Sequence, residues 1–370
     1  MVQVASKFAD QLHTFFEAND CVNAEIGLLQ PADPYLETAG EDFRRLMFLT
    51  SDQTSTSLCL RPEFTVPVCL HHLASGQLPV RYGYVGTVFR QREGEPHEFD
   101  QAGIEDLGNE NRVEADIASL LDAETILRKL GVGAITILLG DQAIFKALLL
   151  ALGLPKAWRE KLGREFGDTA RLNQSLTRLS GESSNPYEDL PADLVEHINS
   201  DDAQAVTGWI TNKMRASGLP LSAGRTPRAI ASRLMDKVEL TSATLSDEKR
   251  TALEQFLAID APIEDAAKIM NDFEAANSLS LGPSLKNLKS RFEGIQSSGM
   301  DNCSIHYQAS FGRRLDYYTG QVFEIYANDG KRPLVGGGRY DHLMSILGAE
   351  STVPAVGFSI WMDRLEQVVS

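Results

Sequence analysis

The sequence predicts an α+β fold: an antiparallel sheet flanked by helices, with a helical insertion inside the chain. Three observations lead to this prediction. Strand-like runs rich in Val, Ile, Phe and Tyr lie in both terminal parts of the 370-residue chain, an amphipathic helix precedes them, and a long polar segment of helical period separates the two sets. The chain is 43% hydrophobic and 23% charged, which suffices for a sizeable core in about two or three domains.

The first elements are a helix, a region of strands and loops, and a hairpin. Apolar side chains recur at helical spacing over residues 5–18, which predicts an amphipathic helix. Residues 26–68 mix short apolar runs with Pro, Gly, Ser and Thr, as strands joined by loops do. Residues 80–90 and 98–107 are expected to pair as an antiparallel hairpin around a polar turn at 91–97.

A helix, a strand and a second helix are predicted to follow the hairpin. Leucine and isoleucine side chains share one helical face over residues 114–130, and Gly131 is expected to end this helix. Residues 134–139 form an apolar run typical of a buried strand. Asp141 is placed to cap the helix that begins directly after it.

The middle of the chain differs in character. Residues 156–295 are polar, rich in Ser, Glu, Lys and Ala, and helical in period, and they show no catalytic spacing. We expect them to form a helical insertion or subdomain within a discontinuous core made of residues 1–155 and 296–370.

Strands are predicted to return in the C-terminal part. Residues 304–309 and 320–326 are strand-like. Gly336 to Gly338 are expected to form a turn, followed by a helix from about Tyr340. A last strand and helix are expected from Ala355 to the end of the sequence.

Composition argues against several classes of function. A net charge of −16 and a pI near 4.9 disfavour a nucleic-acid partner, and no Lys/Arg run is long enough to contact one. The four cysteines form no CxxC pair and no His/Cys cluster has zinc spacing, so we expect no metal and no cofactor. The N-terminus does not resemble a signal peptide, and the longest apolar run, residues 145–154, is too short for a bilayer. We therefore expect a cytoplasmic protein with no membrane partner.

The most informative segment is residues 313–326, with the sequence Arg-Arg-Leu-Asp-Tyr-Tyr-Thr-Gly-Gln-Val-Phe-Glu-Ile-Tyr. It places two arginines, an aspartate and two tyrosines beside a short strand. Arginine matches a carboxylate with two parallel hydrogen bonds, and a tyrosine hydroxyl can bond a polar ring, so the segment is suited to a zwitterion with a polar side chain. Taken alone, it fits an ordinary strand with a charged lead-in equally well.

Three further segments complete a pattern. They are Leu60 to Pro67 (Leu-Arg-Pro-Glu-Phe-Thr-Val-Pro), Arg81 to Gly108 (with Val-Phe-Arg and Glu-Phe-Asp-Gln-Ala-Gly-Ile-Glu), and Pro354 to Leu365 (with Pro-Ala-Val-Gly-Phe and Asp-Arg-Leu). With residues 313–326 and the Gly-Gly-Gly-Arg-Tyr-Asp of 336–341, they resemble the histidine branch of the class II aminoacyl-tRNA synthetases in order and spacing. The second segment resembles motif 2, the last resembles motif 3, and the others resemble the histidine-contacting loops.

The resemblance implies a histidine pocket. In that family a Glu and a Thr of the first segment meet the ammonium, the motif 2 Arg holds the carboxylate, and a Gln and a Glu of the return strand face the ligand. An Arg and paired tyrosines come from the arginine-tyrosine segment. The matching residues here are Glu63, Thr65, Arg90, Gln101, Glu105, Arg313, Tyr317 and Tyr318.

The chemistry of these side chains agrees with that assignment. Glu63 offers an acceptor to an ammonium, and Arg90 and Arg313 offer donors to a carboxylate. Glu105 and Tyr318 are suited to the two nitrogens of a neutral imidazole, of which one donates and one accepts. Each residue alone fits a salt bridge as well, whereas the set favours a retained histidine pocket.

Departures from the synthetase pattern concentrate on its ATP side. Arg92 stands where the family has a glutamate that contacts adenine, and Trp361 stands where motif 3 has a second glycine close beneath the nucleotide. The loop of residues 92–97 lacks the basic residues that hold ATP phosphates and tRNA. Arg364 is kept, and we expect it to be structural. We also expect the protein to lack the anticodon-binding domain that follows motif 3 in the synthetases.

This combination is most similar to the regulatory subunits of ATP phosphoribosyltransferase. That resemblance implies a protein without catalysis of its own, which assembles with a short-form catalytic subunit for the first step of histidine biosynthesis. The partner transfers a phosphoribosyl group from phosphoribosyl pyrophosphate to ATP. Histidine is the expected feedback effector, and a homodimer within a larger hetero-oligomer is the expected assembly.

Three alternatives remain open. A functional histidyl-tRNA synthetase core would need an intact ATP site, against which Arg92 and Trp361 argue. A stand-alone histidine-binding or translation-control relative would need a basic surface or an appended kinase or RNA-binding module. A synthetase-like amide ligase would again need ATP.

Overall fold

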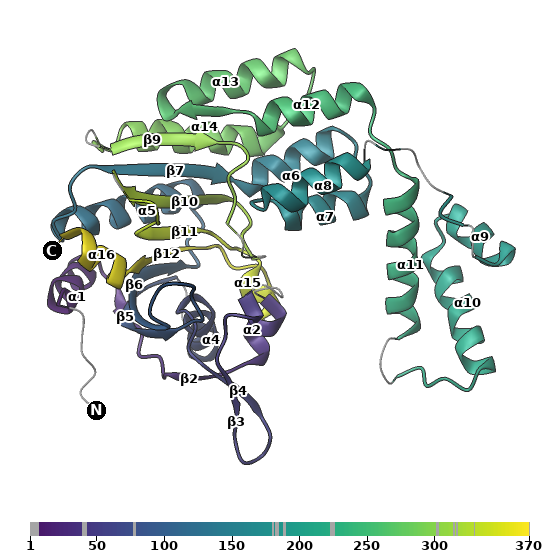
Figure 1. The fold of residues 1–370 in the computed structure, drawn as a ribbon, viewed down its shortest axis with the longest axis horizontal. Coiled ribbons are helices and arrows are strands. Elements are labelled where there is room, and N and C mark those ends of the chain that lie inside the picture. Colours follow the sequence, from purple (N-terminus) through teal and green to yellow (C-terminus); the bar gives the residue numbers. More distant parts are fainter. Residues whose placement is uncertain are drawn as a thin grey trace. The chain divides into compact units, whose positions relative to one another are not determined.

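The computed structural model describes residues 7–38, 43–76, 79–179, 181, 185–187, 190–222, 226–300, 303–313, 315, 317–328 and 330–369 (Figure 1). Residues 5 and 6 of the predicted first helix, and Arg314 and Asp316 of the arginine-tyrosine segment, lie outside these ranges. The chain divides into two compact units, one of residues 1–148 with 255–370 and one of residues 149–254.

The first unit is built on a mixed sheet with the strand order β1-β5-β6-β12-β11-β10-β7-β9-β8. Two pairs, β1–β5 and β7–β9, are parallel, and the other pairs are antiparallel. The described strands are β1 (Val22–Asn23), β5 (Val80–Phe89), β6 (Glu98–Leu107), β7 (Ile135–Asp141), β8 (Asp260–Pro262), β9 (Cys303–Gln308), β10 (Gln321–Ala327), β11 (Val335–Arg339) and β12 (Ala355–Trp361). The predicted antiparallel sheet is therefore confirmed, with a parallel pair near each edge.

Helices and a small second sheet complete this unit. The helices are α1 (Ala9–Ala18), α2 (Asp33–Thr38), α4 (Thr65–Ser75), α5 (Arg112–Lys129), α13 (Ile263–Ala276), α14 (Gly282–Gln296), α15 (Leu343–Ile346) and α16 (Met362–Val369). The second sheet has the order β2-β4-β3, from β2 (Leu29–Pro31), β4 (Ser57–Leu60) and β3 (Leu49–Ser51). Helix α5 packs on the central strands and α14 packs on α5, so both cover one face of the sheet.

Elements with strong local signals form where the sequence predicts them. Strands β5 and β6 make the expected hairpin, with Val80 opposite Leu107 and Phe89 opposite Glu98. Helix α5 is followed by Gly131, whose φ of +91° suits glycine. The carboxylate of Asp141 accepts hydrogen bonds from the backbone N–H groups of Ala143 (2.7 Å) and Ile144 (3.1 Å), as predicted for the helix cap.

The predicted turn at Gly336 to Gly338 is wrong, because these glycines lie inside β11, between β10 and β12. A Cβ atom on Gly337 would lie 2.5 Å from the ring of Phe323 and 2.7 Å from the carbonyl oxygen of Gly357. The run therefore serves close packing in a central strand. The helix expected from about Tyr340 begins at Leu343.

The second unit is smaller than the expected insertion of residues 156–295. Its helices are α7 (Lys156–Glu165), α8 (Thr169–Leu179), α9 (Ala192–Asn199), α10 (Ala203–Ala216) and α11 (Pro227–Ser242). The second unit begins within α6 (Gln142–Ala151) and ends within α12 (Asp247–Leu257). The remaining residues of these two helices belong to the first unit. Residues 255–295 belong to the first unit instead, because β8 pairs with β9 and α14 packs against α5.

No helix in the described ranges is both long enough and apolar enough to cross a bilayer.

Replacing Gly337 with Ala should lower the free energy of unfolding by about 1–3 kcal/mol, because the added methyl group overpacks the centre of the sheet. Urea unfolding followed by circular dichroism measures this change. Gly133→Ala is the control, since a Cβ atom there meets nothing within 4 Å. Equal stability of the two variants would contradict the packing explanation.

Candidate functional site

A cavity of about 40 Å³ lies over the central strands of the first unit. Its lining residues are Phe43, Glu63, Thr65, Arg90, Gln101, Arg313, Leu315, Tyr317, Tyr318, Gly336, Tyr340, Gly357, Phe358, Ser359 and Trp361. Every residue of the predicted histidine pocket is among them except Glu105. Segments far apart in the sequence therefore converge as the resemblance implies, while the ligand itself stays a prediction.

The acidic end of the cavity is Glu63, at the start of α4. Its two carboxylate oxygens accept hydrogen bonds from the backbone N–H groups of Thr65 (2.5 Å) and Val66 (2.9 Å). Burial raises the pKa of Glu63, and these bonds and the charge of Arg90 oppose that rise. Each carboxylate oxygen has a second lone pair, so Glu63 can still accept a hydrogen bond from an ammonium group.

Arg90 faces Glu63 from the end of β5. Its Nε donates to the carbonyl oxygen of Pro62 at 2.7 Å, while its terminal nitrogens have no acceptor among the described residues. Burial lowers the pKa of Arg90 to about 10, with Glu63 acting in the opposite direction, so the guanidinium remains charged at neutral pH. A half-buried cation with unused donors is suited to a carboxylate.

Gln101 carries an unused polar atom on the cavity wall. Its side chain, on β6, is 1% exposed, and its Oε1 atom has no hydrogen-bond donor in the described part of the chain. Buried polar groups are nearly always paired, and an unpaired one commonly marks a position that a ligand or ordered water fills.

A network of arginine and tyrosine forms the opposite wall. Arg313 donates from Nη1 to the hydroxyl oxygen of Tyr318 at 2.7 Å and from Nε to Glu324 at 3.3 Å. The hydroxyl group of Tyr326 donates to the other oxygen of Glu324 at 2.5 Å. The charge of Arg313 is thus partly balanced, and its guanidinium lies close over the backbone of Gly336.

Glu105 lies one layer behind the cavity, whereas the sequence predicted a direct contact with the ligand. Its carboxyl group sits beside the backbone of Gly357 and accepts hydrogen bonds from the hydroxyl groups of Thr65 (2.7 Å) and Tyr340. Burial raises its pKa to about 8, against the opposing effect of these bonds. Glu105 therefore positions two lining residues.

Tyr340 is a lining residue that the sequence analysis did not assign, although it stands in the quoted Gly-Gly-Gly-Arg-Tyr-Asp stretch. Its ring lies edge-on to that of Tyr317, with 5.9 Å between centroids. Tyr340 directly follows β11. Because the glycines of β11 were expected to form a turn, the sequence did not indicate that the side chain of Tyr340 lines the cavity. Phe43 and Ser359 were also missed, and no local signal distinguishes them.

Ion pairs occupy the neighbouring region where the synthetase resemblance places ATP. The guanidinium of Arg92 lies 3.4 Å over the ring of Phe99, and its Nη2 donates to Asp363 at 2.8 Å. Arg364 donates from Nε and Nη2 to the two oxygens of Glu95, both at 3.0 Å. These contacts agree with the expected structural role of Arg364.

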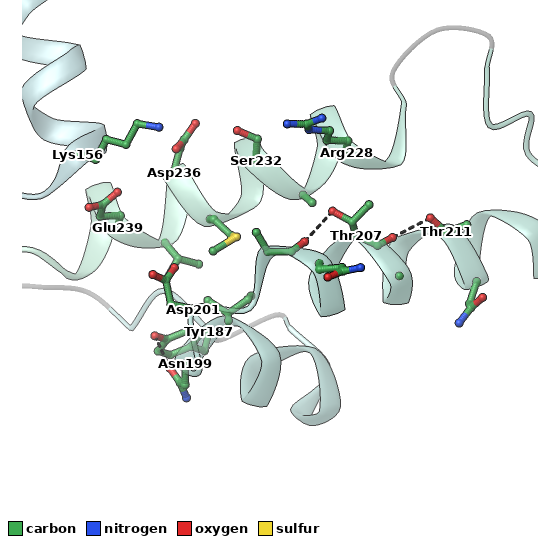
Figure 2. A pocket seen from close by; sticks show the side chains of 18 of the residues that line it. Lys156, Tyr187, Asn199, Asp201, Thr207, Thr211, Arg228, Ser232, Asp236 and Glu239 are labelled. Carbon is green, nitrogen blue, oxygen red and sulfur yellow. Dashed lines mark hydrogen bonds between the residues drawn. The ribbon is translucent and has the colours of Figure 1, made fainter.

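A larger cavity of about 1260 Å³ lies in the second unit, between α7, α9, α10 and α11 (Figure 2). Its charges are of both signs, and the hydroxyl groups of Thr207 and Thr211 donate to carbonyl oxygens of their own helix. None of its lining residues has a buried polar atom without a partner in the described ranges. The smaller cavity is therefore the better candidate.

Metal binding has no support in the described residues, where no group of three or more His, Cys, Asp or Glu side chains could hold an ion.

Comparison with known proteins places the chain in a family. A family model described as histidyl-tRNA synthetase matches residues 4–204 and 224–365. A protein of Mesorhizobium japonicum, named ATP phosphoribosyltransferase regulatory subunit, is 46% identical over 360 residues, or 97% of this chain and 96% of the relative. A protein of Rhizobium rhizogenes with the same name is 43% identical over 361 residues, with the same coverage. The chain belongs to the family of ATP phosphoribosyltransferase regulatory subunits.

Solved structures show the same fold at lower identity. A protein from Bacillus halodurans, titled ATP phosphoribosyltransferase regulatory subunit/histidyl-tRNA synthetase, is similar with a TM-score of 0.66 and 19% identity, covering 98% of this chain and 78% of the other. A histidyl-tRNA synthetase from a Nostoc species gives a TM-score of 0.63 and 16% identity, covering 99% and 73%. This regulatory-subunit family thus has the class II synthetase fold that the sequence predicted.

Replacing Glu105 with Gln should flatten the pH dependence of stability. The folded pKa of Glu105 is raised from 4.5 to about 8, so between these values the folded protein holds a proton that the unfolded chain has lost. The free energy of unfolding therefore falls as pH rises across this window, by at most about 1.4 kcal/mol per pH unit. Glu105→Gln keeps the shape of the neutral group and cannot ionise.

Urea unfolding from about pH 5 to 8 measures this effect. The exposed Glu110, changed to Gln, is the matched control and should keep the wild-type slope. A wild-type slope in Glu105→Gln as well would show that Glu105 ionises normally in the folded protein.

Proposed function

We propose that this chain is the non-catalytic, histidine-sensing subunit of an ATP phosphoribosyltransferase, and that a short catalytic subunit is its partner. The names of its relatives support the regulatory role. The single observation that carries the histidine assignment is the cavity, in which acceptors at Glu63 face donors at Arg90 and the Oε1 atom of Gln101, which has no hydrogen-bond partner among the described residues. Feedback inhibition of histidine biosynthesis follows if the bound amino acid favours an inactive complex.

The two charged ends of the cavity suit a free amino acid. Glu63 accepts hydrogen bonds from an ammonium group, while the free nitrogens of Arg90 donate to a carboxylate. Glu63 is buried and Arg90 is half-buried, so each is stabilised by a ligand of opposite charge. A peptide or an amine without the carboxylate would leave Arg90 unpaired and would bind more weakly.

The remaining polar groups suit an imidazole side chain. Gln101 and Tyr318 line the cavity and can each accept or donate, as a neutral imidazole requires. Glu105 holds Thr65 and Tyr340 in place from behind. An apolar side chain would leave the buried Oε1 atom of Gln101 without a partner, which is the physical basis of selectivity.

Histidine binding needs more room than the cavity has. About 40 Å³ accommodates a few water molecules at most, given about 10–15 Å³ for each. The guanidinium of Arg313, which occupies the space over Gly336 and is bonded to Tyr318, has to move for the ligand to enter. Feedback regulation requires two conformations that bind histidine with different affinity. The wall with Arg313 over Gly336 is one of them, and the wall with Arg313 displaced by histidine is the other.

The alternative of a histidyl-tRNA synthetase core is disfavoured by the occupied region beside the cavity. Adenylation of histidine needs ATP next to the amino acid, where Arg92 covers Phe99 and Arg364 is fixed on Glu95. We therefore assign the chemistry of the complex to the partner.

A homodimer within the complex is part of this proposal. Large apolar side chains are exposed on and beside the small sheet, with Leu28 at 45%, Leu29 at 52% and Leu49 at 50% exposure. Leu29 and Leu49 pair with successive residues of β4 and so lie on opposite faces of the small sheet, which leaves the homodimer resting on the family resemblance and not on a single apolar patch. A second copy of the chain is the occupant that fits a self-complementary dimer.

Replacing Arg90 with Gln should weaken histidine binding by about 1.5–3 kcal/mol, or roughly 10- to 150-fold in Kd, because a charged hydrogen bond to the carboxylate is lost. Calorimetric titration of the full chain with histidine measures the affinity. In a complex with the catalytic subunit, the histidine concentration for half-inhibition should rise in parallel.

Arg128→Gln provides the matched control, because the side chain of Arg128 is 65% exposed and its one ion pair among the described residues is with Glu124 on its own helix. It removes the same charge and should leave both histidine measurements unchanged. Failure of the wild-type chain to bind histidine would refute the sensing role, and an unaltered Kd in Arg90→Gln would refute the assigned pocket.

A further inference from the structure

We propose that Arg339 is a positioning residue for the amino-acid cavity, and that it holds a cluster of cavity tyrosines in place from the opposite face of the sheet. This tyrosine cluster is Tyr317, Tyr318 and Tyr340, all of which line the cavity. The inference deepens the proposed function, on which it rests for the identity of the ligand. It adds a residue outside the cavity that sets the affinity for histidine.

The side chain of Arg339 lies on the face of β11 that is turned away from the cavity. Successive residues of a strand point to opposite faces of a sheet. A Cβ atom on Gly338 would lie 2.9 Å from the ring of Tyr318, so position 338 faces the cavity. Arg339 is the next residue, and its side chain reaches Asp116 of α5 on the other face.

A buried network of charges fixes the guanidinium of Arg339. Its Nε donates to Asp116 at 2.7 Å, its Nη1 donates to Asp341 at 2.8 Å, and its Nη2 donates to the carbonyl oxygen of Arg112 at 2.9 Å. Arg339 and Asp341 are 5% exposed. Burial disfavours the charged form of Arg339, but the two carboxylates outweigh this effect and raise its pKa. Each guanidinium nitrogen therefore has an acceptor, and the group remains charged.

The backbone of Arg339 is joined to the tyrosine cluster through Thr319. Thr319 directly follows Tyr318 in the chain, and its backbone N–H donates to the carbonyl oxygen of Arg339 at 2.8 Å. The backbone N–H of Asp341 donates to the hydroxyl oxygen of Thr319 at 3.1 Å. The segment that carries Tyr317 and Tyr318 is thus bonded at its end to the two charged residues.

Tyr340 stands between the same two charged residues, Arg339 and Asp341. Its backbone N–H donates to the carbonyl oxygen of Ala355 at 2.8 Å. The N–H of Ala355 donates in turn to Oδ1 of Asp341 at 3.0 Å. The network therefore sets the backbone from which the ring of Tyr340 enters the cavity.

Stability alone does not explain so many buried charges. Asp116 also accepts from Nη1 of Arg291 at 3.1 Å, and Arg291 bonds Asp141 as well. Desolvation offsets most of the attraction in such a network, so a packed apolar core would stabilise the sheet as well or better. Apolar contacts are non-directional, however, whereas an arginine fork requires a fixed geometry of its acceptors. The Arg339 end of the network therefore serves to position the chain around it.

Nuclear magnetic resonance of full-length Arg339→Lys with ring-labelled tyrosine tests the proposal. Lysine keeps the charge but lacks the planar fork that bonds three acceptors at once. The signals of Tyr318 and Tyr340, identified by their loss in the Tyr318→Phe and Tyr340→Phe proteins, should move in Arg339→Lys without any ligand. In calorimetric titration, this variant should bind histidine more weakly by roughly fivefold or more, because hydrogen bonds from misplaced groups are lost.

Arg291→Lys is the matched control, because Arg291 is as buried as Arg339 and bonds the same Asp116. Both variants should lower the free energy of unfolding. Only Arg339→Lys should move the tyrosine signals and weaken histidine binding, since no hydrogen bond of Arg291 leads to the tyrosine cluster.

Thr319 offers a second test that leaves every charge in place. Thr319→Val removes the hydroxyl group that bonds Arg339 and Asp341, so it should move the same tyrosine signals and weaken histidine binding. Thr319→Ser keeps the hydroxyl group and should retain the wild-type spectrum and affinity. This pair decides the question if Arg339→Lys does not fold.

Unmoved tyrosine signals in the folded Arg339→Lys and Thr319→Val proteins would overturn the proposal. Equal movement in Arg291→Lys would also overturn it, as would an unchanged histidine affinity in a variant whose tyrosine signals have moved. In those cases the network only stabilises the fold. The spectra need no ligand, so moved signals in a protein whose wild type does not bind histidine would support the positioning role and refute the proposed function alone.

Discussion

The site depends on the close approach of polar side chains to glycine backbone in the central strands β11 and β12. Gly336 leaves the space that the guanidinium of Arg313 occupies, and Gly357 leaves the space for the carboxyl group of Glu105. Any Cβ atom at either position would overlap these groups. An arginine and a carboxyl group can therefore lie above the middle of a sheet, where strand residues with side chains would exclude them.

This constraint organises the site into layers. Glu105 lies deepest and fixes Thr65 and Tyr340 through its hydrogen bonds. Those residues join Arg313 and Gln101 in the wall that faces the cavity. Buried ionisable groups contribute little net stability, since desolvation offsets their attraction. Under the proposed function, their presence in such number serves the recognition of a charged, polar ligand.

Trp361 divides the amino-acid half of the site from a half filled by ion pairs. On one side the terminal nitrogens of Arg90 have no acceptor among the described residues, and on the other those of Arg364 are bonded to Glu95 and to the carbonyl oxygen of Pro333. The same fold thus holds one open and one occupied subsite. This division is the basis of the proposal that the chain binds an amino acid without nucleotide chemistry of its own.

Local signals in the sequence predicted local structure well. The hairpin of β5 and β6 and the cap at Asp141 follow from patterns a few residues long. The glycines of β11 were misjudged because a glycine run is also a turn signal, and only Phe323 and other distant residues show that it lies within the sheet. Residues 255–295 have a helical period like that of the second unit, yet pairing of β8 with β9 fixes them in the first. Seven of the eight residues predicted for the pocket line the cavity. The position of Glu105 behind the cavity wall could not be predicted, because it depends on Gly357, more than 200 residues away in the chain.

The most direct test of this account is a crystal structure of the full chain grown with both histidine and a non-hydrolysable ATP analogue. The account predicts histidine between Glu63 and Arg90, with Arg313 displaced from its place over Gly336. Arg92 should remain on Phe99, with no nucleotide beside Trp361. A base stacked on Phe99 in place of Arg92, with phosphates on Arg364, would contradict the division of the site into an open and an occupied half.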